Sequence, residues 1–205
     1  MVNSASRFEI VTPDSANRAE IEAYIAERYQ QAFNATITTF MPYLSCLRGQ
    51  DDRLLSVCGY CPAAYQPLFL EQYLTDDVAD ALSAHYQQVI TRSSVIEFGQ
   101  LASFSSGTSL PHFHALANGL LSHGYMWCVF TATGPLYALM RRFGLAPHLL
   151  TNADASRLQP TTDQWGNYYT RMPRVCTGNL AQGAEQLERI VSKHRHTENA
   201  NARLI

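Results

Sequence analysis

The sequence predicts an α/β fold of the α+β kind, a mixed sheet with helices packed on it, and three observations lead to this prediction. Hydrophobic residues make up 46% of the 205 residues and charged residues only 16%, so the chain can bury a sizeable core. The 43 positions 98–140 contain no Asp, Glu, Lys or Arg. This stretch divides into strand, loop, helix and strand, a βαβ unit whose crossover implies parallel pairing. At roughly 150 residues per domain, we expect one domain.

The charge-free stretch gives the clearest elements. We expect a strand over 94–104, a helix over 111–123, a strand over 125–133 and a helix over 134–144. Apolar residues recur in the first helix at the spacing of one helical face: Phe113, Leu116, Ala117, Leu120 and Leu121. That face is therefore expected to pack on the sheet.

The segments before this stretch predict a helix and a hairpin. A helix is expected over 17–32, with Asn17 and Glu20 as a capping box. Two β-rich segments, 36–48 and 53–61, flank a charged turn and predict the hairpin. A second helical region is expected at 68–70 and 75–88, where an acidic first turn precedes the apolar face.

The segments after position 150 are less regular. We expect β-like stretches at 165–169 and 174–176 and a last helix over 180–193. Residues 194–205 are expected to form a loose, flexible tail, so the domain is predicted to span 1–193.

Charge and composition argue against several classes of partner. Fifteen Lys and Arg against seventeen Asp and Glu give a net charge of -2, so nucleic acid is not expected as a partner. Positions 1–11 lack the apolar centre of a signal peptide, and no window offers 18 apolar residues for a membrane span. Five cysteines, an odd number, suit a reducing compartment. We expect a cytoplasmic protein without integral membrane association.

No metal site is predicted. Cys58 and Cys61 have the spacing of a ligand pair, but no second pair follows, and buried strand thiols explain them better. His112 and His114 are two positions apart, which points them away from each other on a helix.

The loop at 105–109 lies where a buried strand becomes a helix, and Pro111 suits the first helical turn. Backbone N–H groups and the positive end of the helix dipole gather at such a point, and Gly107 lets a ligand approach the backbone. The loop is thus a candidate phosphate site. A simple helix cap is the alternative, because the Ser/Gly/Thr motif is short.

Glu97 is the last charge before the apolar run and is expected on a central strand. A buried carboxyl group tends to have a raised pKa and can act as a base near neutrality. The alternative is a structural ion pair with Arg92, Arg141 or Arg142. Gly99, in mid-strand, indicates a bulge or a close backbone approach, which a ligand lying against the strand would explain.

Several segments in this order resemble the thermostable hemolysin family, over about residues 18–180. They are 95–102 (VIEFGQLA), 131–133 (TAT), 141–145 (RRFGL), 165–169 (WGNYY) with Pro173 and Gly178, and the earlier 58–63 (CGYCPA) and 67–73 (PLFLEQY). The family is related to GNAT-type acyltransferases and, more distantly, to acyl-homoserine-lactone synthases.

The resemblance implies a GNAT-like sheet, mixed and strongly twisted, with helices on both faces and a splay between its fourth and fifth strands. It further implies that the pantetheine arm of an acyl thioester lies along the fourth strand and that phosphate meets the next helix. The implied cofactor-binding residues are Gln100, Leu101, Ala102, Ser105, Ser106, Gly107, Thr108 and Ser109. The co-substrate would be acyl-CoA or an acyl group on phosphopantetheine, with no metal.

Two positions depart from the family pattern. Phe104 and Ser109 replace the first and last residues of the phosphate-loop motif, so an acyl carrier protein is an alternative to coenzyme A as donor. Met140 occupies the position of the tyrosine that protonates the leaving thiolate in many relatives. Tyr137, one turn earlier, is the substitute.

The hypothesis is an acyltransferase that moves an acyl group from a thioester to an amine of a small-molecule acceptor. Glu97 would accept the proton from the amine, and backbone N–H groups would polarise the carbonyl. Two alternatives stay open: a membrane-damaging protein, as the family name suggests, and an acyl- or CoA-binding module without catalysis. A homodimer is also left open.

Overall fold

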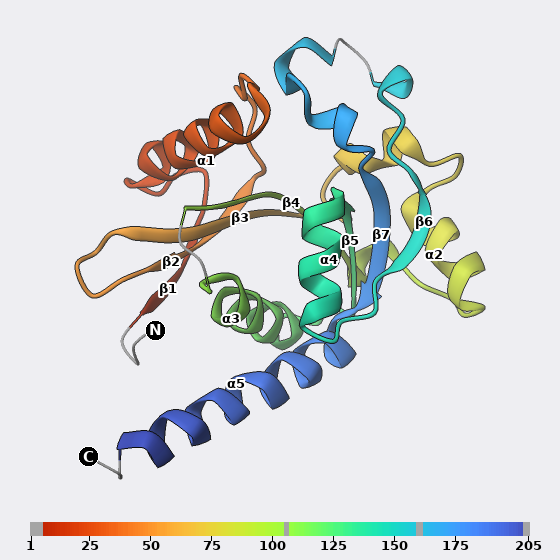
Figure 1. Cartoon of the computed structure of the whole chain (residues 1–205). Helices are drawn as coiled ribbons and strands as arrows, with labels where there is room; N and C mark the ends of the chain where they lie inside the picture. The colour runs from red at the N-terminus through yellow and green to blue at the C-terminus, as the bar shows by residue number, and fades with distance from the viewer. Residues whose placement is uncertain (1–5, 105–106, 159–161, 203–205) are drawn as a thin grey trace.

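The computed structural model describes residues 6–104, 107–158 and 162–202 and shows one seven-stranded sheet (Figure 1). Its strand order is β1-β2-β3-β4-β5-β7-β6. The strands are β1 (Arg7–Val11), β2 (Tyr43–Arg48), β3 (Leu54–Pro62), β4 (Val95–Ser103), β5 (Trp127–Ala132), β6 (His148–Asn152) and β7 (Arg174–Asn179). The α-helices are α1 (Arg18–Phe33), α2 (Val78–Tyr86), α3 (Ser109–Ser122), α4 (Gly134–Arg142) and α5 (Leu180–Ala202).

The β4–α3–β5 unit is the predicted crossover, and β4 and β5 pair in parallel. The other neighbouring strands of the sheet pair antiparallel. The predictions of a mixed sheet and of parallel pairing across this crossover are therefore confirmed.

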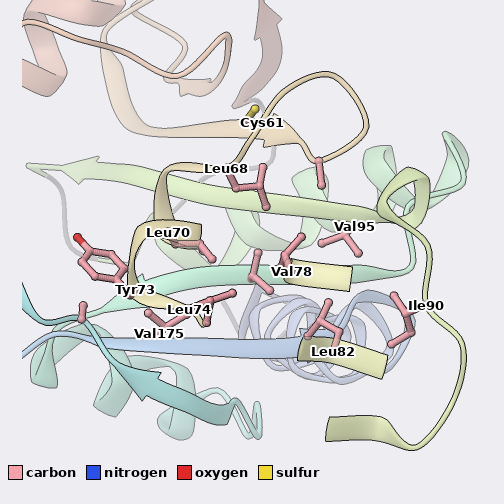
Figure 2. Packing of buried hydrophobic residues seen from close by; sticks show 13 residues of the cluster. Cys61, Leu68, Leu70, Tyr73, Leu74, Val78, Leu82, Ile90, Val95 and Val175 are labelled. Carbon is pink, nitrogen blue, oxygen red and sulfur yellow. The ribbon is translucent and has the colours of Figure 1, made fainter. Parts of the chain in front are cut away.

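Helices cover both faces of the sheet, as predicted (Figure 1). On one face, α3, α4 and α5 pack against residues such as Ile96, Phe130 and Cys176. On the other face, α1 packs over β2 and β3, and α2 with the 3-10 helix η1 (Phe69–Tyr73) packs over Val95, Val129 and Val175. Figure 2 shows this last cluster, with Tyr73 at one end and its hydroxyl directed away from Leu82 and Ile90.

The sheet has two edge strands that the sequence analysis did not predict. Strand β1 pairs with β2, and β6 pairs with β7. Both are five residues long, too short to show a clear alternation of polar and apolar residues. The first strand of the predicted hairpin begins at Tyr43 rather than at 36.

Two predictions about the C-terminal third differ from the structure. Residues 165–169 are not β-like: they belong to the 3-10 helices Thr162–Trp165 and Tyr168–Arg171 and the turn between them. Helix α5 continues to Ala202, past position 193 where we placed its end. The division into a domain over 1–193 and a flexible tail stays a prediction.

The capping box predicted for α1 is wrong. The Asn17 side chain accepts no capping hydrogen bond and instead donates through Nδ2 to Glu9 Oε1 at 2.6 Å. Glu20 forms an ion pair with the buried Arg48, whose Nη2 lies 2.7 Å from Glu20 Oε2. Asn17 thus binds β1 and Glu20 binds β2, because the start of α1 lies over these two strands.

The five cysteines are free and buried. Cys58 and Cys61 pack into clusters on opposite faces of the sheet, as residues three positions apart in a strand must. The two thiols cannot bind one metal ion together. The described residues contain no group of three or more His, Cys, Asp or Glu side chains that could hold a metal ion.

Candidate functional site

Strands β4 and β5 part from each other halfway along their length, and Figure 1 shows them diverging. Their pairing runs from Val95 and Trp127 to Phe98 and Phe130. Beyond that point β4 stays paired with β3 as far as Ser103, and β5 stays paired with β7 as far as Ala132. Each strand follows its outer neighbour, so the predicted splay between the fourth and fifth strands is confirmed.

A β-bulge begins on β4 two residues after Phe98, the last residue of β4 that pairs with β5. Between the pairs Gly59–Gly99 and Val57–Ala102, β3 has the single residue Cys58, whereas β4 has two. The first of these two, Gln100, has a φ of +52°. A bulge bends its strand and increases the local twist, which turns β4 away from β5.

A cavity of about 850 Å³ lies at the splay. It is bounded by residues of β4 and β5 and by helices of both faces. Residues from the α3, α4 and α5 face include Phe113, Leu116, Leu136, Met140 and Leu180. A cavity of this size can take a small-molecule ligand.

Glu97 lines this cavity one residue before the strands part. The residue is only 2% exposed. Its Oε2 accepts a hydrogen bond from Phe69 N at 2.8 Å and its Oε1 accepts one from Leu70 N at 3.1 Å. The carboxyl group thus lies at the start of the 3-10 helix η1.

Burial raises the pKa of Glu97 to about 8, although the two backbone hydrogen bonds act in the opposite direction. Hydrogen bonds to the charged form favour it, and desolvation disfavours it. A carboxyl group with a pKa near 8 exchanges a proton readily close to neutrality, as a general base must.

The ion pair that we considered for Glu97 is absent from the described residues. Arg92 binds Glu71, at 2.5 Å between Nη1 and Oε1, and also Asp77. Arg141 and Arg142 lie in the last turn of α4, on the opposite face from the Glu97 carboxyl group. The structural explanation by an ion pair is wrong, and backbone N–H groups hold the carboxyl group instead.

The side chain of Met41 occupies the space beside Gly99. A Cβ atom at Gly99 would lie 2.5 Å from Met41 Cε, and one at Gly59 would lie 2.9 Å from Met41 Cβ. The close approach that we attributed to a ligand is therefore made by Met41. The two glycines, which face each other on β3 and β4, let Met41 lie flat on the sheet.

Gln100 ties the chain segment around Met41 to the bulge. Its Oε1 accepts from Met41 N at 2.9 Å, and its Nε2 donates to Thr39 O at 2.7 Å. Arg18 adds bonds to Met41 O and Pro42 O at 2.8 and 2.9 Å. Gln100 lines the cavity, and its side chain binds two further lining residues, Thr39 and Met41.

The other residues assigned to the fourth strand differ in their surroundings. Leu101 lines the cavity and packs with the cluster under α3 and α4. Ala102 is buried under α1, on the opposite face. The side chains of Leu101 and Ala102 therefore cannot both face one ligand arm.

The candidate phosphate loop is described in part, and Ser105 and Ser106 lie outside the described residues. Gly107 has a φ of +79°, and a Cβ atom there would meet nothing within 4 Å. Thr108 is buried and its side chain does not cap α3; its Oγ1 lies 3.0 Å from Ser103 Oγ. Ser109 is the first residue of α3.

Tyr137 is not among the residues that line the cavity. It lies on α4, and the guanidinium carbon of Arg174 is 5.5 Å from the centre of its ring. The structure therefore does not bring Tyr137 together with Glu97.

Seven aromatic residues, which we call the aromatic cluster, line the cavity on the face where Glu97 lies. The sequence analysis did not select them as site residues. Contacts between rings with centres 5.1 to 6.5 Å apart connect them. They are Tyr29, Phe33, Phe69, Tyr73, Trp165, Tyr168 and Tyr169.

Backbone bonds hold Trp165 and its neighbours on the end of α1. Thr36 N donates to Gln164 O, and Asn167 N donates to Phe33 O, both at 2.8 Å. Gly166 between them has a φ of +52°, and a Cβ atom there would lie 2.2 Å from Phe33 O. The turn needs glycine, and the density of aromatic residues in WGNYY was the signal that could have indicated a pocket wall.

None of the helices in the described part of the chain is both long enough and apolar enough to cross a membrane.

Solved structures with low sequence identity share this fold. TofI, in a ternary complex with an inhibitor and MTA, matches with a TM-score of 0.59 and 13% identity over 89% of this chain and 96% of that chain. FeeM, an N-acyl amino acid synthase from uncultured soil microbes, gives 0.59 and 11%, over 89% and 96%. BjaI, a CoA-dependent acyl-homoserine lactone synthase with SAM and isopentyl-CoA, gives 0.57 and 10%, over 92% and 90%. The mixed, splayed sheet is thus the GNAT-like fold that we expected.

No curated protein matches the sequence. One family model does match, that of the thermostable hemolysins, and it covers residues 11–184. The match includes every strand except β1, and it includes the splay, Glu97 and the aromatic cluster. The chain belongs to the thermostable hemolysin family.

Proposed function

We propose that this protein is an N-acyltransferase that moves an acyl group from a thioester, on coenzyme A or on an acyl carrier protein, to an amine of a small molecule. One observation carries the proposal: a buried carboxyl group with a raised pKa lies where two parallel strands separate. A proton acceptor at this position would line a cavity that is bounded by residues from both faces of the sheet.

The donor side of the proposal rests on the edge of β4 and on the face formed by α3 and α4. From Gly99 onward, β4 is not paired with β5, so its backbone can hydrogen-bond the amide groups of a pantetheine arm. Phe113, Leu116, Leu136 and Met140 give that side of the cavity an apolar lining, which suits an acyl chain.

The phosphate end of the donor would meet the first turn of α3. Gly107 leaves room at this point, and the N-cap side chain of Thr108 does not occupy the first N–H groups of the helix. A helix N-terminus attracts negative charge.

The chemistry needs one proton carrier. The amine nitrogen attacks the thioester carbonyl carbon, and Glu97 accepts the proton from nitrogen directly or through a water. The C–S bond then breaks, and the protonated Glu97 returns the proton to the leaving sulfur. The sum is an amide and a free thiol, with Glu97 restored. Tyr137 has no step here because it does not line the cavity.

The structural neighbours support the same class of reaction. One is described as a CoA-dependent synthase of acyl-homoserine lactones, another as a synthase of N-acyl amino acids. The first description names coenzyme A as the donor that the synthase depends on, and the second names an N-acyl product, on this same fold.

The test is release of free thiol from acetyl-CoA, octanoyl-CoA and palmitoyl-CoA in the presence of a panel of small amines, with the amide identified by mass spectrometry. We expect amine-dependent thiol release with at least one donor, and the same panel is repeated with acyl carrier protein as donor. A thermal shift with acyl-CoA but no turnover would make the protein a binding module. Neither binding nor turnover with any donor would overturn the proposal, and dye release from liposomes would then favour membrane damage.

A further inference from the structure

The chemistry of the wall around Glu97 suggests which amines this site accepts, an inference that rests on the proposed function. The wall on the Glu97 face is the aromatic cluster. Phe69 connects the two directly, because its backbone N–H binds the Glu97 carboxyl group while its ring contacts Tyr73 and Trp165.

The aromatic cluster presents both buried and open rings. Tyr73 is 1% exposed, and its hydroxyl lies 2.5 Å from that of Tyr169. Phe69 lines the cavity and is 37% exposed, so the aromatic cluster reaches solvent at this residue. An acceptor that binds beside the Glu97 carboxyl group therefore lies against these rings.

Aromatic faces and a carboxylate favour the same ligand charge. The face of an aromatic ring carries negative potential and attracts ammonium groups. A carboxylate attracts them as well, whereas it repels a second carboxylate, strongly so where water is excluded. An amine suits this wall, whereas an α-amino acid would bring a negative charge next to Glu97.

The basic side chains that line the cavity lie away from this wall. Of the described lining residues, only Arg189 and His148 have such side chains. Arg189 is on α5, which packs on the opposite face of the sheet. His148 is three strands away from Glu97, through the successive partners Thr177 and Val129. Since neighbouring strands are about 4.8 Å apart, His148 lies roughly 14 Å from Glu97.

We propose that the acceptor is a primary amine with an aromatic or apolar body and no carboxylate next to its nitrogen. The aromatic cluster binds the body of the amine by stacking and holds the nitrogen toward Glu97. The site thus discriminates by what surrounds the nitrogen rather than by the nitrogen alone.

The experiment uses pairs of acceptors that differ only in the carboxylate, with the acyl-CoA that gives the fastest thiol release. The pairs are phenylethylamine with phenylalanine and isoamylamine with leucine. We expect kcat/KM to be at least about 100-fold higher for the amine of each pair. Equal or faster acylation of the amino acids would overturn this inference while leaving the acyltransferase proposal intact. No transfer to any of the four would count against the proposed function itself, and the inference would fall with it.

A second measurement assigns the recognition to the aromatic cluster. Trp165→Leu should raise KM for phenylethylamine about tenfold, and change kcat and the KM for acyl-CoA less than twofold. Tyr65→Leu is the matched control, since Tyr65 is 68% exposed and does not line the cavity. An unchanged KM for phenylethylamine in Trp165→Leu would contradict the assignment.

Discussion

The two faces of the sheet meet at the splay but are built in different ways. The face under α3, α4 and α5 mixes aliphatic and aromatic side chains, and much of it comes from the continuous charge-free stretch at positions 98–140. The opposite face has Glu97 and the aromatic cluster, whose residues come from α1, from η1 and from the loop before β7. Regular helices thus line the side that we assign to the donor, whereas irregular segments together with the end of α1 line the side that we assign to the acceptor.

This difference has a functional meaning. An arm such as pantetheine is the same for every donor, and a strand edge beside a helix can bind it through backbone groups. An acceptor must be told apart from similar molecules, which needs particular side chains on segments that can vary. The predictions below test whether the two faces have these separate roles.

The largest effect is expected for Glu97→Gln, beside the splay where the two faces meet. An amide of the same shape cannot accept the amine proton, so kcat should fall by about 100- to 1,000-fold. Thiol release at saturating donor and acceptor measures it.

The control for this substitution is Tyr137→Phe. Tyr137 lies outside the cavity lining, so kcat should stay within about threefold of wild type. A loss of kcat in Tyr137→Phe as large as that in Glu97→Gln would show that Tyr137 protonates the leaving thiolate after all. Circular dichroism checks that Glu97→Gln still folds, because the carboxyl group also binds two backbone N–H groups.

Gly166→Ala should damage the acceptor face selectively. The left-handed φ and the clash with Phe33 O are expected to cost about 2–4 kcal/mol of unfolding free energy, measured by urea denaturation. The displaced Trp165 loop should raise KM for the amine more than KM for acyl-CoA. Gly119→Ala is the control, since a Cβ atom there meets nothing within 4 Å. An equal rise in both KM values would mean that the faces do not act separately.

The dependence of rate on pH should follow the Glu97 carboxyl group. Its pKa is raised to about 8 by burial, and the base must be deprotonated, so kcat/KM should increase about tenfold per pH unit below 8 and level off above it. Methoxyamine as acceptor isolates this ionisation, because it is itself neutral over the range. A profile that is flat from pH 6 to 9 in wild type, or an inflection near 8 that persists in Glu97→Gln, would contradict the assignment.

The smallest effect is expected on the donor face. Leu136→Trp, on α4, places a larger side chain at the apolar lining and should raise KM for octanoyl-CoA about five- to tenfold, with less change for acetyl-CoA. Leu139→Trp is the control, because Leu139 is on the same helix and outside the lining. Equal behaviour of the two variants would place the acyl chain elsewhere.

The sequence predicted the donor face better than the acceptor face for a physical reason. A βαβ unit has its contacts within one stretch, so the absence of charge and the helical spacing of Leu116 and Leu120 are enough to place it. The spacing of apolar residues could not predict the splay, which we expected only from the family resemblance. It depends on which outer neighbour each strand follows, a contact between distant segments.

The acceptor face was beyond what local patterns could show. Trp165 belongs to a segment rich in β-forming aromatic residues, and we predicted it to be β-like. The turn at Gly166 and its bonds to the end of α1 override that propensity. Gly99 correctly signalled a close approach, but only the fold could show that Met41 makes it. Glu97 was found because a lone acid on an apolar strand stands out in any sequence.

Two strands that are hydrogen-bonded at one end and separate at the other enclose a wedge. The rungs up to Phe98 and Phe130 fix its apex, and the gap widens from there toward the bulge at Gln100. A flat carbonyl group can reach the apex, whereas bulky parts of either substrate must remain where the wedge is wide. The width of the gap would therefore decide which part of the donor lies beside the Glu97 carboxyl group. Only the flat thioester, which holds the bond to be broken, would be thin enough to reach it.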